Sequence, residues 1–249
     1  MSYKTCFRFY EELNDFLTGS LRKKYIPFGF EVSPSVKDAI ESLGVPHTEV
    51  DLILANGNSV DFFYRLKDGD RISVYPEFET LDITPLIKLR LKPLRITRFV
   101  LDVHLGKLAR NLRMLGFDCL YQNDIEDSQI VDLATNEKRV VLTRDLGILK
   151  HKIITRGYFL RSQDPWEQTK EVIDRLHLSN QLKPFTRCID CNGQLKPVNK
   201  SLIVDQLEPG TRGNFDKFYQ CTSCDKIYWP GSHYQKMVQR IDALAKASD

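Results

Sequence analysis

The sequence predicts an α/β protein with a parallel sheet at its centre, a small α+β unit before it and a metal-binding segment after it. Strand and helix signals alternate through residues 98–183, the pattern of a parallel sheet with crossover helices. Residues 1–76 combine short strands with one amphipathic helix, and residues 184–249 contain two Cys-x-x-Cys pairs. Residues 77–97 have mixed charge without clear periodicity, so we expect a linker there.

The N-terminal segment contains several short elements of opposite periodicity. Lys4 to Tyr10 alternates as a strand does, whereas the apolar residues of Ser35 to Leu43 are spaced as one face of a helix. A strand at Val50 to Ala55 runs into the turn signal Asn56-Gly57, and a last strand is expected at Arg71 to Tyr75. These elements make a compact α+β unit.

This order of elements resembles the β-grasp, or ubiquitin-like, domains of the sulfur-carrier type. Those carriers end in Gly-Gly directly after the last strand, whereas Pro76-Glu77-Phe78-Glu79 follows here. A carrier in sulfur transfer is therefore a weak alternative. The resemblance implies a domain that binds a protein partner or places a substrate.

The middle segment supplies the parallel sheet. We expect strands at 98–103, 118–121, 140–143 and 157–160, and helices at 105–115, 127–138 and 165–176. In open α/β sheets the working residues collect at the carboxyl ends of the strands. Candidate site residues are therefore sought at these positions.

Composition narrows the classes of protein. Hydrophobic residues make up 42% and charged residues 28%, as in ordinary globular proteins. No run approaches the roughly 20 apolar residues that span a bilayer, and the N-terminus has no signal-peptide pattern, so we expect a cytoplasmic location and no membrane partner. The net charge of +3 is compatible with a nucleic-acid partner without requiring one.

Four of the six cysteines form the pairs Cys188/Cys191 and Cys221/Cys224. Four thiolates on two turns suit tetrahedral Zn²⁺ and leave no open coordination position, so the expected zinc is structural. The alternative, two redox dithiols or disulfides, fits a reducing compartment less well. Aromatic residues gather in residues 228–234, where they could stack on unpaired bases or pack the ribbon.

Two aspartates end predicted strands of the middle segment. Asp102 ends the first strand and Asp145 ends the third, so both side chains should emerge at one edge of the sheet. Carboxylates gathered there favour a bridging hard cation such as Mg²⁺ or Mn²⁺, which lowers the pKa of an attacking water. The third acidic ligand is left open between Asp127, which could equally cap its helix, Glu126 and Asp164.

Basic residues recur at helical spacing just after Asp102. Lys107, Arg110 and Arg113 are expected to project away from the apolar face of their helix and to contact an RNA backbone, with a solvated helix face as the alternative. Arg144 is a further candidate for phosphate contact, or could hold the neighbouring Asp145 in place.

Two long runs carry a family resemblance. They are residues 99–116 (FVLDVHLGKLARNLRMLG) and 139–149 (RVVLTRDLGIL), and Asp164-Pro165, Gln168, the cysteine pairs and YWPGSH at 228–233 accompany them. Together they resemble the PIN-like ribonuclease family named for the C-terminal part of the Mut-seven exonuclease. The resemblance covers residues 98–240 and, in outline, 1–76.

The resemblance implies a PIN-like domain joined to a zinc ribbon, with an N-terminal ubiquitin-like domain. It implies that Asp102 and Asp145 are metal ligands and that Asp127 matches the acidic position before the second helix. Gln129 stands where many members have an acid. The expected function is metal-dependent hydrolysis of RNA, with tRNA or rRNA among the candidate partners. The alternative is an inactive adaptor that binds RNA or the ribosome.

Overall fold

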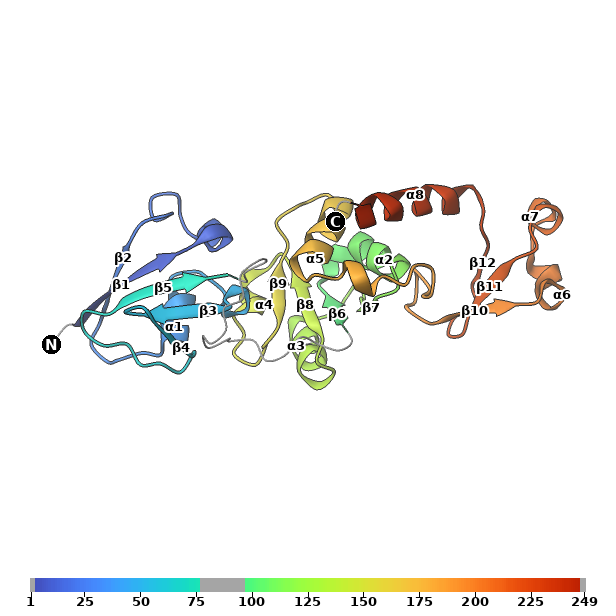
Figure 1. Cartoon of the computed structure of the whole chain (residues 1–249). Coiled ribbons are helices and arrows are strands. Elements are labelled where there is room, and N and C mark those ends of the chain that lie inside the picture. The colour runs from blue at the N-terminus through green and yellow to red at the C-terminus, as the bar shows by residue number, and fades with distance from the viewer. Residues whose placement is uncertain (1–2, 77–96, 247–249) are drawn as a thin grey trace. The chain divides into compact units, whose positions relative to one another are not determined.

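The computed structural model describes residues 3–76 and 97–246 (Figure 1). The chain divides into two compact units. Unit 1 comprises Met1–Ile96 with Asp145–Phe159, and unit 2 comprises Thr97–Arg144 with Leu160–Asp249. Apart from Thr97, the predicted linker 77–97 lies outside the described residues. Among the described helices, none has the length and apolar character needed to cross a membrane.

Unit 1 is built on a mixed five-stranded sheet in the order β2-β1-β5-β3-β4. β1 pairs in parallel with β5, and the other neighbours are antiparallel. The strands are β1 (Tyr3–Phe9), β2 (Ile26–Phe30), β3 (Leu52–Ala55), β4 (Asn58–Val60) and β5 (Arg71–Tyr75). The helical elements are η1 (Glu11–Phe16), α1 (Val36–Ser42) and η2 (His47–Glu49).

Helix α1 covers the sheet as its apolar spacing predicts. Ser35 caps the helix by accepting a hydrogen bond from the backbone of Asp38, and Val36 and Ile40 are fully buried against the core of the unit. Asn56 and Gly57 both have positive φ, at 51° and 85°, as a type I′ hairpin turn requires. That turn leads into β4, a short strand that the sequence did not predict.

Residues 145–159, which the sequence analysis assigned to the middle segment, make their contacts within unit 1. This segment contains α4 (Leu146–Leu149) and β9 (Gly157–Phe159). His47 Nε2 lies 2.8 Å from the carbonyl oxygen of Ile154, and the Glu49 carboxylate accepts from the backbone N–H of Phe159 at 2.7 Å. Ile154 is 1% exposed. The N-terminal domain therefore supplies partners for residues more than a hundred positions away in sequence.

Unit 2 contains a parallel sheet in which β7, β6 and β8 lie side by side in that order. Val100 of β6 stands opposite Leu120 and Val141. The strands are β6 (Arg98–Leu101), β7 (Asp118–Leu120) and β8 (Val140–Thr143). The helical elements are η3 (Val103–Leu105), α2 (Gly106–Met114), α3 (Asp127–Asn136), α5 (Pro165–Arg175) and η4 (Ser179–Gln181). The strand-helix alternation read from the sequence is confirmed here.

Helix α2 positions the chain beyond Asp102. Leu108 and Leu112 are fully buried, and the Asn111 amide donates to the carbonyl of Pro165 on α5 at 3.1 Å. Gly116 ends the helix with φ of +96°, and a Cβ there would lie 2.2 Å from the carbonyl oxygen of Lys183. Only glycine therefore allows this close approach of the two backbones.

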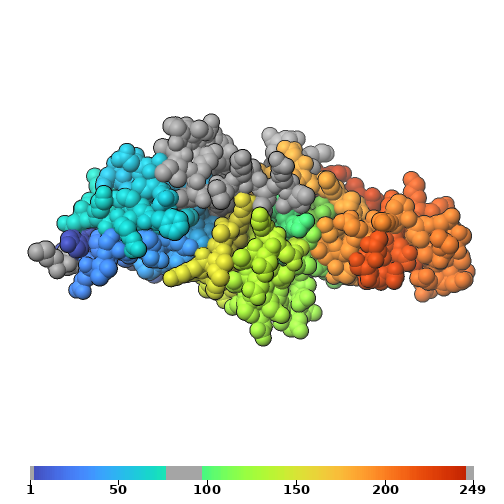
Figure 2. Space-filling model, turned by 90° about the horizontal axis from the view of Figure 1, so that it is seen from below, coloured from blue at the N-terminus to red at the C-terminus, as the bar shows by residue number. Residues whose placement is uncertain are grey.

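The C-terminal part of unit 2 is a three-stranded antiparallel sheet in the order β10-β11-β12. Its elements are β10 (Leu195–Val198), α6 (Lys200–Ile203), η5 (Val204–Gln206), α7 (Pro209–Asn214), β11 (Phe218–Cys221), β12 (Ile227–Tyr228) and α8 (Ser232–Lys246). Ile203, Leu207 and Phe218 form a small core of their own. Figure 2 shows the surface of this segment in orange and red. The sequence analysis predicted the cysteine pairs of this segment but named none of its strands.

Candidate metal centre and active site

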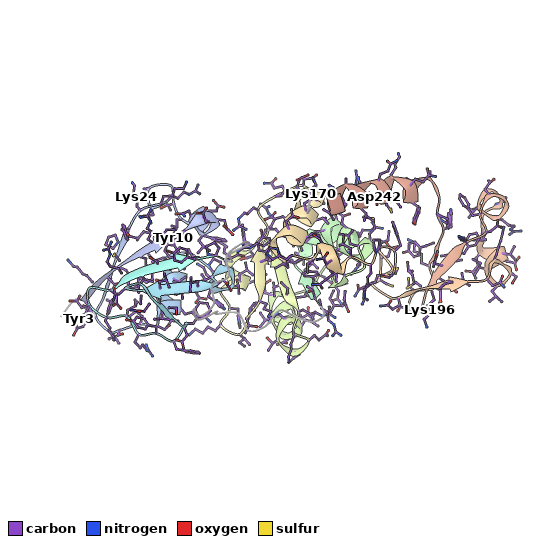
Figure 3. The ribbon with its side chains drawn as sticks, viewed as in Figure 1. Tyr3, Tyr10, Lys24, Lys170, Lys196 and Asp242 are labelled. Carbon is purple, nitrogen blue, oxygen red and sulfur yellow. The ribbon has the colours of Figure 1, made fainter. Side chains whose placement is uncertain are left out.

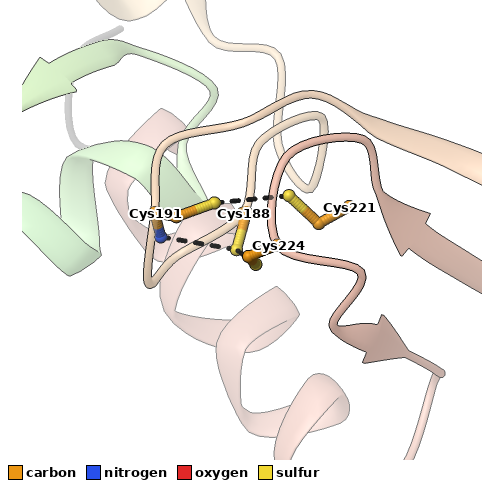
Figure 4. A group of neighbouring side chains, drawn as sticks. All are labelled: Cys188, Cys191, Cys221 and Cys224. Carbon is orange, nitrogen blue, oxygen red and sulfur yellow. Dashed lines mark hydrogen bonds between the residues drawn. The ribbon is translucent and has the colours of Figure 1, made fainter.

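The four paired cysteines converge from two loops of unit 2 (Figure 4). All four sulfur atoms lie within 4.8 Å of one another, with 3.7 Å between Cys188 Sγ and Cys224 Sγ and 3.3 Å between Cys191 Sγ and Cys221 Sγ. A tetrahedron with Zn–S bonds of about 2.3 Å has sulfur separations of about 3.8 Å. The cluster could therefore hold a metal ion such as zinc, as the spacing of the cysteines predicted.

The loops around the cluster are shaped to present thiolates. Backbone N–H groups of Gly193 and Ser223 point at Cys191 Sγ and Cys221 Sγ, at 3.5 and 3.4 Å. A Cβ on Gly193 would lie 2.7 Å from Cys221 Sγ, so a larger residue would displace the sulfur.

Cys188 has an additional partner in the hydroxyl of Tyr228, 3.0 Å from its sulfur. Burial of Cys188 opposes ionisation, but the hydrogen bonds from Tyr228 and from the backbone outweigh it and lower the pKa of the thiol to about 7. A lowered thiol pKa favours the thiolate that a metal ion binds.

Asp102 lies at the carboxyl end of β6 and is 8% exposed. One carboxylate oxygen accepts from the N–H of Val103 at 2.6 Å, and the other accepts from the hydroxyl of Thr143 at 2.8 Å. Thr143 ends β8, the parallel neighbour of β6. The two strand ends therefore meet at the edge where the sequence placed Asp102, and Thr143 is a partner that the sequence analysis missed.

Asp145 follows β8 by two residues and caps α4, with one carboxylate oxygen accepting from the N–H of Gly147 at 2.6 Å. Its side chain is exposed. Arg144, in unit 2, donates from one guanidinium nitrogen to the carbonyls of Leu160 and Arg161, at 3.3 and 3.0 Å. Arg144 therefore fixes the chain that follows β9, a role not foreseen from the sequence.

The acidic residues before α3 differ from expectation. Asp127 was predicted as the cap, but Glu126 occupies that position, and Asp127 is exposed in the first turn. Glu126 and Gln129 form a reciprocal capping box, in which the N–H of Glu126 donates to Gln129 Oε1 at 3.0 Å. Gln129 thus has a structural use at the position where the resemblance led us to expect an acid.

Asp164, the remaining alternative for a third ligand, caps α5. Its carboxylate accepts from the N–H groups of Trp166 and Glu167, both at 2.9 Å, and these bonds lower its pKa below the usual range. Across residues 3–76 and 97–246, the four cysteines are the one group of three or more Cys, His, Asp or Glu side chains with ligand spacing. The acidic candidates form no such group in the part of the chain described.

Comparison with known families found two family models that match the chain. A family model described as Mut7-C RNAse domain matches residues 97–241, more than half of the chain. A second model, described as Mut7-C ubiquitin, matches residues 3–82. The chain belongs to the Mut7-C RNAse domain family. No curated protein and no solved structure matches it. The resemblance read from the sequence, including the N-terminal ubiquitin-like domain, is thereby confirmed.

Helix α2 of the Mut7-C domain does not present all three of its basic residues. Lys107 is exposed, and Arg110 is exposed and pairs with Asp190 at 2.7 Å. Arg113 is only 4% exposed, so the prediction that it projects into solvent is wrong. Its guanidinium donates to the carbonyls of Cys119, Ile189 and Asp190 at 2.7–3.2 Å. Three residues make less than one full helical turn, so each successive basic residue points further round the helix. Arg113 therefore faces the loop of the first cysteine pair rather than solvent.

A second set of contacts joins the loop that carries the first cysteine pair to the sheet. The Asp118 carboxylate accepts from Arg139 at 2.8 Å and from the amide of Asn192 at 2.9 Å, and Asn192 Oδ1 accepts from the N–H of Cys119 at 3.0 Å. Asn192 has a positive φ of 71°, which asparagine tolerates better than most residues. Asn192 therefore docks this loop onto β7, a role that the sequence analysis did not foresee.

A cleft of about 760 Å³ opens beside α2, within unit 2. Its lining includes His104, Lys107, Arg110, Tyr121, Asn123 and Gln168. His104 is two residues beyond Asp102, so the cleft starts next to the carboxyl end of β6. Basic and amide side chains of this kind bind phosphate and sugar groups of nucleic acids.

Proposed function

We propose that the chain is a metal-dependent ribonuclease in which Asp102 and Asp145 hold a divalent cation, Mg²⁺ or Mn²⁺. The cation would supply Lewis-acid assistance and an activated water for attack on the phosphodiester. Asp127 is the proposed third acidic residue, with its carboxylate in solvent. The parallel sheet would then be the PIN-like sheet that the family resemblance implies.

The observation that carries the proposal is the environment of Asp102. A carboxylate that is 8% exposed is costly unless it is bonded, and Asp102 is held by Val103 N–H and the Thr143 hydroxyl. These two donors fix the carboxylate at the sheet edge and leave lone pairs for a further ligand. The adjoining cleft has Lys107 and Arg110 in its lining, where an RNA backbone would be neutralised.

The cysteine cluster has a separate task in this proposal. A four-cysteine zinc site has no open coordination position, so zinc would hold the ribbon together rather than activate water. The ubiquitin-like domain, which lacks the diglycine of carriers, would bind a protein partner or place the RNA. Its contacts with residues 145–159 connect it to the segment that begins with Asp145.

The test is cleavage of labelled RNA with Mn²⁺ or Mg²⁺ by the wild-type chain and by Asp102→Asn. The amide keeps the shape of the carboxylate but binds a cation poorly, so we expect cleavage to fall by at least about 100-fold, or about 2.7 kcal/mol of activation free energy. Asp132→Asn is the matched control, because Asp132 is exposed on α3. Cleavage at the wild-type rate by Asp102→Asn would contradict the proposal.

The second candidate is an RNA- or ribosome-binding adaptor without turnover. It is favoured by the use of Gln129 in a capping box, at a position where the family resemblance implies an acid. An adaptor would bind the same RNA in the presence of Mn²⁺ without cutting it. Affinity and cleavage measured on one preparation therefore separate the two functions.

A further inference from the structure

A groove of about 860 Å³ lies within unit 2, between residues 184–187, the strands β11 and β12, and the start of α8. Its volume is in the range of about 300–1,000 Å³ typical of ligand sites. Five aromatic side chains line it: Phe185, Tyr219, Tyr228, Trp229 and Tyr234. We call it the aromatic groove. It is separate from the cleft beside α2, and only Ile189 lines both.

The aromatic rings of the groove are held in place yet accessible. Tyr219 and Trp229 keep 40% and 39% of their surface exposed. The rings of Phe185 and Tyr234 pack with centroids 4.5 Å apart, which fixes the wall between the connecting segment and α8. Rings fixed before binding lose little conformational entropy when a ligand stacks on them.

Trp229 is supported from inside the ribbon. Its ring centroid is 6.5 Å from that of the buried Phe218, and a Cβ on Gly231 would lie 3.2 Å from Trp229 Nε1. Packing of the ribbon therefore accounts for part of the indole surface. The rest of the Trp229 surface stays exposed, although apolar surface is costly to leave in water, and packing within the described part of the chain does not account for it.

Charge indicates the class of ligand. The lining includes Arg187, Lys217, Lys226 and His233, and none of its residues is Asp or Glu. Lys226 forms an ion pair with Asp190, whereas Lys217 is exposed and has no recorded ion pair among the described residues. Exposed aromatic faces together with cations match bases linked by phosphates. A neutral apolar peptide would use the rings but not the cations.

We propose that the aromatic groove binds unpaired bases of single-stranded RNA by stacking, with Lys217 next to the phosphates. The proposal rests on RNA being the substrate of the Mut7-C domain. It assigns the ribbon a direct part in substrate binding, at a place distinct from the carboxylates that would cut the chain. Selection for unpaired RNA follows, because bases within a duplex offer no free faces.

Equilibrium binding of a fluorescent single-stranded RNA of about 10 nucleotides tests the groove. The full chain is used without added Mg²⁺ or Mn²⁺, so that no cleavage occurs. Tyr219→Ala and Trp229→Ala should each weaken binding by about 5- to 150-fold, the range for loss of one stacked base. Phe63→Ala is the matched control, since Phe63 is an 85% exposed aromatic in unit 1, and it should bind like wild type.

A second pair of variants tests the phosphate contact. Lys217→Ala should reduce the slope of log affinity against log salt by about 0.7, because one fewer counterion is released from a single strand. Lys196→Ala, an exposed lysine on β10 outside the groove (Figure 3), should leave that slope unchanged. An oligonucleotide of equal length without bases cannot stack on the rings. Its affinity for the wild-type chain should therefore be no higher than the affinity of intact RNA for Trp229→Ala.

Several outcomes would overturn the proposal that the aromatic groove binds RNA. These are binding by both aromatic variants within twofold of wild type, equal affinity for the oligonucleotide without bases, and capture of proline-rich peptides but not RNA. If Trp229→Ala loses metal or misfolds, the exposed Tyr219 still decides the matter. The outcome is independent of the nuclease assay. If the chain binds RNA through these rings but never cuts it, the proposal for the aromatic groove stands. If the chain cuts RNA and the groove variants bind RNA like the wild type, the proposal is refuted.

Discussion

Replacing Arg113 by methionine should destabilise unit 2 and loosen its metal site together. Methionine keeps the bulk of the aliphatic stem but removes the charge and every donor. The guanidinium makes four hydrogen bonds, two to the carbonyl of Cys119 and one each to those of Ile189 and Asp190. Ile189 and Asp190 lie between Cys188 and Cys191, the first cysteine pair.

The magnitude follows from what the substitution leaves behind. Each of the three carbonyls would lose a charged donor in a place where Arg113 is 4% exposed, at a cost of about 1–1.5 kcal/mol for each. The sum, about 3–5 kcal/mol, equals the usual cost of removing one partner from a buried polar network. For a unit of this size it lowers Tm by about 6–20 °C.

The assay is thermal and urea unfolding of the metal-loaded chain, with metal release to a chelator followed in parallel. Arg110→Met is the control, because Arg110 is three residues away on the same helix and its side chain is 58% exposed. Its single ion pair with Asp190 is worth less than about 1 kcal/mol. Equal stability losses for the two variants, or unaltered metal release from Arg113→Met, would refute the reasoning.

Three further perturbations test other parts of the molecule. Cys188→Ser removes one of four thiolates and should abolish stoichiometric zinc, whereas Cys6→Ser should retain it, as metal analysis would show. Burial alone would raise the pKa of Asp118, but the hydrogen bonds that its carboxylate accepts outweigh burial and lower the pKa. The carboxylate therefore contributes to the stability of the folded chain above about pH 3.9, and this contribution is lost as pH falls through the lowered pKa. Acid unfolding curves of wild type and Asp118→Asn should therefore converge at low pH, and parallel curves would count against this. Deletion of residues 1–76 should raise amide exchange in residues 145–159, which lose their hydrogen-bond partners, while zinc content stays at the wild-type level.

The elements of both units were largely readable from periodicity. Apolar residues at helical spacing identified α1, and the unbroken apolar run of β8 identified a buried parallel strand. The short strands β10 and β12 were not predicted, because strands of four and two residues next to the cysteine loops carry too little periodic signal. The contacts of residues 145–159 with the N-terminal domain were not foreseen, since periodicity reports which residues are buried but not against what.

The sequence by itself determined the family, the four-cysteine cluster and the position of Asp102 at a strand end, because each depends on residue identity at local spacing. Tertiary structure decided how the basic residues of α2 are divided. Arg110 and Arg113 have the same chemistry and the same local signal, yet one is 58% exposed in its side chain and the other is enclosed by three carbonyls. That difference arises from a loop more than seventy residues away, which only folding brings to the helix.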